Sequence, residues 1–197
     1  MRHVEGGTNL PRVSLRPLLL TDTPRLARYV SNPLVSQYLR SALPQPYELA
    51  HAVSFYEVCE RNEQDGISLT RAIVAEDEFC GCISTVFAFD VHACSAEVGY
   101  WIGRPYWGQG IASRAIGLMA DLIFTQFPDI HRLYCNMFAE NLASVRAAQK
   151  AGFTQRATFP NALVRDGQLS DECVCDLTRI QWRANRQNDC NGSEKPL

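Results

Sequence analysis

The segment Tyr106-Trp107-Gly108-Gln109-Gly110-Ile111-Ala112 places two glycines one residue apart, between two different periodic patterns. The run 97–102 before it alternates like a strand, and the run 111–127 after it has the apolar spacing of a helix. Glycine lets the backbone bend and lets an anion approach the amides closely, and the first N–H groups of a helix lack partners within the helix. The segment therefore predicts a backbone cradle for phosphate oxygens, which needs no lysine.

Two other phosphate-binding loops do not fit this segment. A P-loop requires Gly-Lys followed by Ser or Thr, and the chain contains no Gly-Lys pair. The dinucleotide fingerprint requires a third glycine three residues after Gly110, where this chain has Ser113. Taken alone, a tight turn between a strand and a helix would explain the two glycines about as well as a ligand would.

A second segment, residues 141–153, predicts a helix after another strand. It follows the strand-like run 133–138 and begins at Asn141, a residue type that favours helix starts, while Gly152 ends it. The apolar positions between them recur at helical spacing, which predicts a helix with one buried face. These positions are Leu142, Val145, Ala148 and Ala151.

Together the two segments resemble the Gcn5-related N-acetyltransferase (GNAT) superfamily, and within it the branch of the ribosomal-protein N-acetyltransferases RimJ and RimL. That branch has Glu-x-Gly-Tyr-Trp-Ile, then Tyr-Trp-Gly-Gln-Gly-x-Ala, then Asn-x-x-Ser, then Gly-Phe. This chain matches these motifs in the same order at residues 97–102, 106–112, 141–144 and 152–153. The resemblance extends over roughly residues 10–180.

The resemblance implies an α/β (α+β) fold of the GNAT type, in which helices flank a mixed, mostly antiparallel central sheet with a splayed central pair of strands. One domain is expected over residues 10–182, followed by a polar tail over residues 183–197 that frays. Helices between residues 23 and 63 are expected to form the acceptor side. Strand-like runs lie at 13–18, 68–75, 79–89, 95–102, 133–138, 156–163 and 172–177.

The same resemblance implies acetyl-CoA as the co-substrate, held mostly by backbone groups. The diphosphate is expected on the glycine segment, and the pantetheine arm on the free strand edge at Trp101 and Ile102, much as an added strand would bind. Asn141 is expected to bind the amides of the arm, and Ser144 to approach the sulfur. The cofactor-binding positions are thus Trp101, Ile102, Trp107, Gly108, Gln109, Gly110, Ile111, Ala112, Asn141 and Ser144.

Two residues are candidates for catalysis. Ser144 is the candidate proton donor to the departing thiolate, because the tyrosine that many superfamily members have four residues later is Ala148 here. Glu97 is the candidate base, acting directly or through water, because the glutamate that some relatives have five residues before the helix asparagine is Asn136 here. Ordinary structural roles compete: a helix cap for Asn141, a local backbone bond for Ser144, and a salt-bridged or surface carboxylate for Glu97.

The acceptor is expected to be a primary amine that attacks the thioester directly. A weak base favours an α-amino group, with a pKa of about 7.7 to 8, over a lysine amine near 10.4 that is almost fully protonated at neutral pH. The expected acceptors are therefore protein N-termini or small-molecule amines.

Arg104 and Arg114 either pair with the 3′-phosphate of the nucleotide or face water. The alternative function is a non-catalytic acyl-CoA binding sensor or regulatory module.

Composition argues against several other classes. The formal charge is −2 without long runs of like charge, so no direct nucleic-acid partner is expected. Residues 1–7 do not resemble a signal peptide and no apolar run is long enough to span a bilayer, which predicts a cytoplasmic protein without a membrane partner.

The pairs Cys80-x-Cys82 and Cys173-x-Cys175 are too close for structural zinc and are expected to be buried thiols, each pair on one strand face, so no metal is expected. The oligomeric state stays open, with a homodimer among the states considered.

Overall fold

The computed structural model describes residues 10–39 and 43–192, with side chains to residue 188. The expectations for residues 1–7 and for the last five residues lie outside this part of the chain. In the described part, one sheet has the strand order β1-β2-β3-β4-β5-β7-β6. The strands are β1 Val13–Pro17, β2 Ser68–Ala75, β3 Glu78–Phe87, β4 Ser95–Ile102, β5 Arg132–Phe138, β6 Thr154–Arg165 and β7 Gln168–Thr178.

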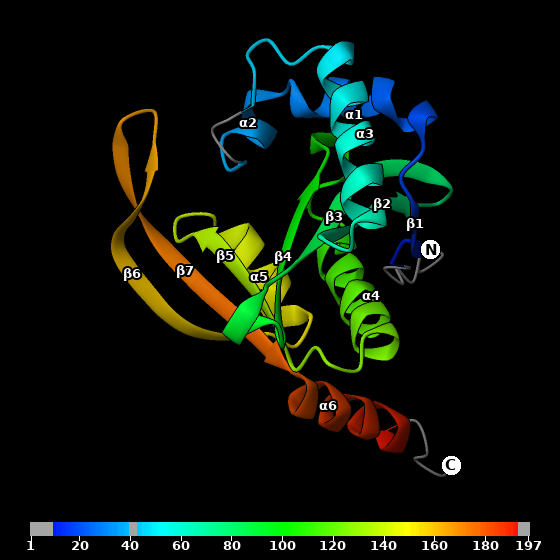
Figure 1. Cartoon of the computed structure of the whole chain (residues 1–197), viewed down its shortest axis with the longest axis vertical. Coiled ribbons are helices and arrows are strands. Elements are labelled where there is room, and N and C mark those ends of the chain that lie inside the picture. Colours follow the sequence, from blue (N-terminus) through cyan, green and yellow to red (C-terminus); the bar gives the residue numbers. More distant parts are fainter. Residues whose placement is uncertain (1–9, 40–42, 193–197) are drawn as a thin grey trace, which may run out of the picture.

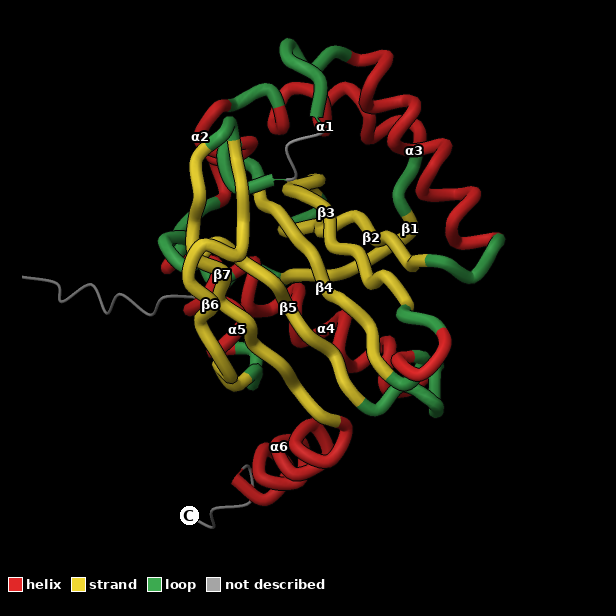
Figure 2. Tube along the Cα trace, turned by 60° about the vertical axis from the view of Figure 1, so that its left-hand side comes forward, coloured by secondary structure: helices red, strands yellow, loops and turns green. Residues whose placement is uncertain are grey.

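Helices cover both faces of this sheet (Figures 1 and 2). One face carries α1 Thr23–Val30 and α3 Leu49–Gln64, with the short α2 Pro33–Ser36 between them in sequence. The other face carries α4 Ile111–Gln126 and α5 Leu142–Lys150, and α6 Arg179–Gly192 follows β7. Each face has its own apolar core, because alternate residues of a strand point to opposite faces. None of the helices in the described residues is long and apolar enough to cross a membrane.

The central strands β4 and β5 separate after a short parallel start. They pair only at Ser95–Arg132, Ala96–Leu133 and Glu97–Tyr134, whereas β4 stays paired with β3 as far as Ile102. On the other side, β5 stays paired with β7 as far as Phe138. Beyond Glu97 the two strands are therefore each held by an outer neighbour and not by each other. This confirms the predicted mixed, mostly antiparallel sheet with a splayed central pair.

Helix α4 is held at its C-terminal end by a buried arginine. Arg179 donates hydrogen bonds to the carbonyl oxygens of Phe124, Phe127 and Ile130, and burial lowers the pKa of its guanidinium. These bonds satisfy carbonyls that the end of a helix leaves without partners. Since this end is anchored, the opposite end of α4, which carries the glycine segment, has a defined position above the sheet.

The polar C-terminal segment differs from its prediction. We expected fraying from about Arg183, and the structure instead continues helix α6 to Gly192. Asp121 of α4 accepts hydrogen bonds from Trp182 Nε1 and from Arg186 Nη1, each at 2.7 Å. The polar side chains of α6 therefore have partners on α4 that lie about 60 residues earlier in the chain, and no local pattern reveals such partners.

The Cys80-x-Cys82 pair also differs from its prediction, whereas Cys173-x-Cys175 agrees. Cys80 is buried in the core beneath α4 and Cys82 in the core beneath α1 and α3, so their thiols lie on opposite faces. A β-bulge opposite Ile73 and Val74 inserts one residue here and breaks the alternation. Cys173 and Cys175 share the α4 face. Burial raises the pKa of Cys80 to about 11 and that of Cys175 to about 12, so these thiols stay protonated and behave as small apolar groups.

Gly81 allows β3 and β4 to approach closely, and its replacement tests this packing. A Cβ atom at position 81 would lie 2.1 Å from the carbonyl oxygen of Trp101. Gly81→Ala should therefore lower the free energy of unfolding by about 1–3 kcal/mol or more, as overpacking does, measured by denaturant unfolding. Gly117→Ala in α4 is the control, because a Cβ there meets no atom within 4 Å and alanine favours helix. Equal stability of the two variants would contradict the close approach of β3 and β4 at Gly81.

Candidate active site

The glycine segment forms an exposed reversal between β4 and α4. The 3-10 turn Arg104–Tyr106 follows β4, and Gly108 and Gly110 then adopt positive φ angles of 77° and 75°. Gly110 is the N-cap of α4 in the left-handed conformation, and no side chain caps the helix. The amides of the first turn of α4 are thus available to an anion, and residues 107–110 are exposed to solvent. The loop is accessible to solvent, and a phosphate cradle at these amides stays a prediction.

Of the two residues predicted for the edge of β4 beside the gap, Ile102 has backbone groups that face the gap and Trp101 does not. The Trp101 carbonyl points toward β3, since a Cβ on Gly81 would meet it, so the Trp101 backbone does not face β5. Backbone groups alternate along a strand, so those of Val98, Tyr100 and Ile102 face the gap. The Ile102 carbonyl accepts a hydrogen bond from Trp107 Nε1 at 2.6 Å, which ties the indole of the loop to the end of β4.

A hydrogen-bond network crosses from β4 to α5 at this gap. The Tyr100 hydroxyl donates to the Ser144 carbonyl at 2.8 Å, so the Ser144 Oγ, also at 2.8 Å, must be the donor to Tyr100. The Tyr100 oxygen lies 3.6 Å from Met137 Sδ on β5. Burial raises the pKa of Tyr100 above its ordinary value, so the phenol stays protonated. Tyr100 is part of the Glu-x-Gly-Tyr-Trp-Ile motif, but no role was predicted for it. The only signal in the sequence is its position on the strand, which points it to the face that α5 covers.

Asn141 and Ser144 begin α5 on the side of the gap. The Asn141 side-chain oxygen accepts a hydrogen bond from the Ser144 amide at 3.2 Å, so Asn141 is an N-cap in this structure. This leaves the Asn141 side-chain amide hydrogens for another partner. Ser144 is half-buried, and its hydroxyl is the group that connects the helix start to β4. The structure thus brings Ser144 and the β4 edge together.

Glu97 lies at the point where the two central strands separate. It forms the last paired rung with Tyr134, is half-buried, and is on the face of the sheet that carries α1 and α3. Asn136, two residues beyond Tyr134 on β5, points to the same face and is exposed. Glu97 and Ser144 therefore belong to opposite faces of the sheet and can approach one reacting centre only through the gap.

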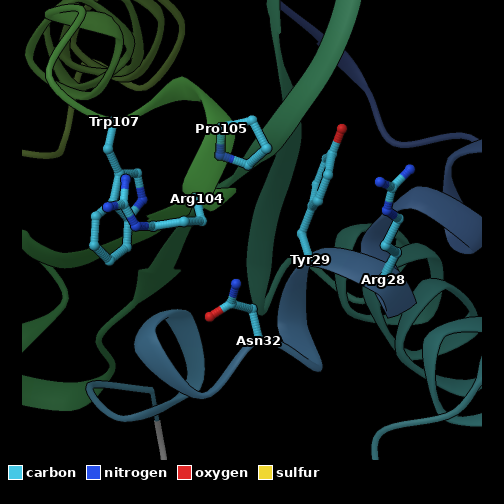
Figure 3. Close-up of a pocket in the computed structure, with 6 residues that line it drawn as sticks. All are labelled: Arg28, Tyr29, Asn32, Arg104, Pro105 and Trp107. Carbon is cyan, nitrogen blue, oxygen red and sulfur yellow. The ribbon is translucent and has the colours of Figure 1, made fainter.

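The face with α1 and α3 also carries a hollow of about 330 Å³ beside the glycine segment. It lies between the end of α1 and the turn after β4, as Figure 3 shows. The Arg104 guanidinium is stacked 4.9 Å from the centre of the Trp107 ring. Arg114, by contrast, is an exposed residue in the first turn of α4. The residues that line the hollow are Arg28, Tyr29, Asn32, Arg104, Pro105 and Trp107.

The far side of this face is bounded by the long β6–β7 hairpin, which extends beyond the sheet in Figure 1. Arg165 near its tip donates a hydrogen bond to the Leu39 carbonyl, after α2. The rings of Tyr38 and Phe138 are in contact with centroids 5.8 Å apart. Helices α1 to α3, which were expected to form the acceptor side, and the β6–β7 hairpin therefore surround one face of the gap. Within the described residues, no three His, Cys, Asp or Glu side chains form a group that could hold a metal ion.

Comparison with known proteins agrees with this geometry. The chain is 26% identical over 184 residues to the spermidine N(1)-acetyltransferase of Escherichia coli K12, covering 93% of this chain and 95% of the relative. It is 31% identical over 104 residues to the [ribosomal protein uS5]-alanine N-acetyltransferase of the same organism, covering 52% of each. Mycobacterium smegmatis RimJ in complex with CoA-disulfide has the same fold, with a TM-score of 0.79 at 21% identity over 91% of this chain and 89% of that one. The family model of the acetyltransferase (GNAT) domain matches residues 12–154, and the chain therefore belongs to the GNAT acetyltransferase family.

Proposed function

We propose that this protein transfers the acetyl group of acetyl-CoA to a primary amine, either the α-amine of a protein N-terminus or the amine of a small molecule. The observation that carries the proposal is the gap between β4 and β5, with an exposed amide cradle at its head and the Ser144–Tyr100 pair along its side. An extended thioester cofactor fits such a gap because its diphosphate and its amide-bearing arm need backbone partners at two separate places.

The cofactor is held by backbone in this proposal. Its diphosphate lies on the amides of residues 108–112, at the positive end of the α4 dipole. Its pantetheine arm runs along the gap-facing groups of Val98, Tyr100 and Ile102, and the free amide hydrogens of Asn141 bind one of its carbonyls. No lysine or arginine is needed at the diphosphate, which accounts for the low charge of the loop.

The chemical step uses Ser144 as the proton donor. The neutral amine attacks the thioester carbonyl and the carbon–sulfur bond breaks. The Ser144 hydroxyl turns from Tyr100 to the departing thiolate and gives it a proton, and solvent water then returns a proton to the serine. Tyr100 positions the serine, because its oxygen accepts the Ser144 hydrogen and its own hydrogen is held by the Ser144 carbonyl. Glu97 accepts the proton of the amine, directly or through water, from the α1 side of the gap.

The class of amine follows from the weak base and from the relatives. An α-amine with a pKa of about 7.7 to 8 is partly neutral at cytosolic pH, whereas a lysine amine is about a thousandth neutral. Two relatives are named for an alanine of a ribosomal protein and for spermidine, and one solved structure of the same fold is described as modifying the N-terminal serine of a ribosomal protein. Both a protein N-terminus and a small amine are thus represented. The α-amine is the acceptor that needs the least help from a base.

Replacing Gly110 tests the cradle. Gly110→Ala places a Cβ on a left-handed residue, at a cost of about 1–2 kcal/mol, and turns the amides away from the anion. The dissociation constant of acetyl-CoA, measured by calorimetry, should rise about tenfold or more. Gly66→Ala is the matched control, since Gly66 has a φ angle of 67° far from the loop and a Cβ there meets no atom within 4 Å. Equal affinities in the two variants would refute the cradle.

Replacing Ser144 and Tyr100 tests the proton donor. Ser144→Ala should lower kcat by about 100-fold, because general acids contribute factors of this order, with little change in the affinity for acetyl-CoA. Tyr100→Phe should lower kcat less, because the serine keeps its hydroxyl but loses its orientation. The double variant should be no slower than Ser144→Ala, since both changes act on one group. Additive losses would contradict the coupling, and an unchanged kcat in Ser144→Ala would remove the serine from the mechanism.

The pH dependence of acetylation tests the acceptor class. With a peptide whose only amine is its N-terminus, the rate should rise with pH and level off above about pH 9, when the α-amine is almost fully neutral. A peptide with a blocked N-terminus and one lysine should react roughly 300-fold more slowly near pH 7, in line with its smaller neutral fraction. The rate of acetylation of each peptide is measured by the release of the free thiol of CoA. A preference for the lysine peptide would show that the site lowers the pKa of lysine.

A further inference from the structure

The hollow beside the glycine segment is lined by hydrogen-bond donors. Arg28 and Arg104 have no acceptor atoms in their guanidinium groups, and Asn32 already uses its side-chain oxygen to accept from the Leu34 amide at 3.0 Å. The two amide hydrogens of Asn32 have no partner in that bond and are free to donate to a ligand. No carboxylate lines the hollow. Since the charged groups on these walls are all donors, the hollow favours a ligand that brings acceptor oxygens.

Arg28 and Arg104 form no ion pair with a carboxylate among the described residues. A few other described arginines, such as Arg61 and Arg114, share this property but do not line the hollow. The arginines that do pair with carboxylates are Arg12, Arg16, Arg25, Arg71, Arg132, Arg156, Arg165 and Arg186. Two unpaired guanidinium groups from separate elements line one hollow, and this concentration of positive charge favours an anion.

The rest of the lining is flat and held in place. Trp107 is fixed by its hydrogen bond to Ile102 and carries the Arg104 guanidinium on its face. Tyr29 packs against Gly103, where a Cβ would lie 2.8 Å from its ring, and its hydroxyl lies 3.4 Å from that of Tyr106. The Arg104 guanidinium therefore lies on a ring that is itself held in place, so this donor would bind an anion with little loss of side-chain freedom.

The position of the hollow separates it from the diphosphate cradle. The amides of the cradle belong to α4, which packs on one face of the sheet, whereas Arg28 and Asn32 belong to α1 and its following turn on the other face. That second face is the one enclosed by α1, α2 and the β6–β7 hairpin. A ligand in the hollow thus approaches the gap from the acceptor side, next to the cofactor loop.

We propose that this hollow binds an anionic group of the acceptor, a carboxylate or a phosphate ester, through Arg28, Arg104 and the Asn32 amide. The inference rests on the proposed acetyl transfer to an amine and specifies its substrate class: an amine that carries acidic groups near its reactive end. Carboxylate and phosphate oxygens match the forked donors of a guanidinium, which binds both in the same way.

Binding of matched peptides tests this inference without requiring turnover. The probes are two fluorescein-labelled peptides with a free N-terminal alanine, one continuing with a run of aspartates and the other with the same run of asparagines. With CoA present, the aspartate peptide should bind more tightly, and Arg28→Gln and Arg104→Gln should each weaken it about five- to tenfold, as expected for a charge-assisted hydrogen bond. The asparagine peptide should be unaffected. Arg61→Gln, an exposed arginine of α3 outside the hollow, is the control and should change neither.

A second arm distinguishes the acceptor from the cofactor as the source of the anion. If Arg28→Gln or Arg104→Gln abolishes the difference in affinity between acetyl-CoA and acetyl-dephospho-CoA, the hollow holds the 3′-phosphate of the cofactor and the inference is overturned. Failure of the aspartate peptide to bind, or equal binding of the two peptides, also overturns it. Tight arginine-dependent binding without acetylation would support the anion subsite and contradict the proposed reaction. Acetylation of both peptides at rates that do not depend on the two arginines would support the reaction and contradict the subsite.

Discussion

The structure depends on the separation of two parallel strands after three paired residues. Because β4 remains bound to β3 and β5 to β7, the sheet stays continuous at its base while its centre opens. The opening leaves gap-facing backbone groups on β4 that an extended, amide-bearing molecule can pair with, as a further strand would. Every component of the proposed site is placed relative to this gap: the cradle at its head, Ser144 and Tyr100 on one side, and Glu97 at its base.

Backbone and side chains have different roles around this gap. The cofactor side relies on amides whose direction is set by two left-handed glycines and by a helix anchored at its far end by Arg179. The acceptor side relies on side chains, with Arg28 and Arg104 lining a hollow beside Trp107. Such a division suits a family in which one cofactor is used with many acceptors, because side chains can change without altering the backbone that holds the cofactor.

Tyr100 connects the two sides of the open sheet. It belongs to β4, hydrogen-bonds to α5 and contacts β5, so one side chain spans the gap that the strands no longer close. The same contacts direct the hydroxyl of Ser144. The same hydrogen bonds therefore bridge the open sheet and orient the proposed proton donor. Because the Tyr100 phenol is buried and stays protonated, the direction of these hydrogen bonds is fixed.

Local periodicity and backbone chemistry were enough to predict much of the fold. The approximate positions of the strands and of the helices before α6, and the glycine reversal before α4, follow from residues close together in the chain. Other features became visible only in three dimensions: the continuation of α6 against Asp121, the bulge that separates Cys80 from Cys82, the pairing of Tyr100 with Ser144, and the presence of both Arg28 and Arg104 in the lining of one hollow. These features join residues that are far apart in the chain, or they depend on the register between strands, and neither leaves a pattern in a local window of sequence.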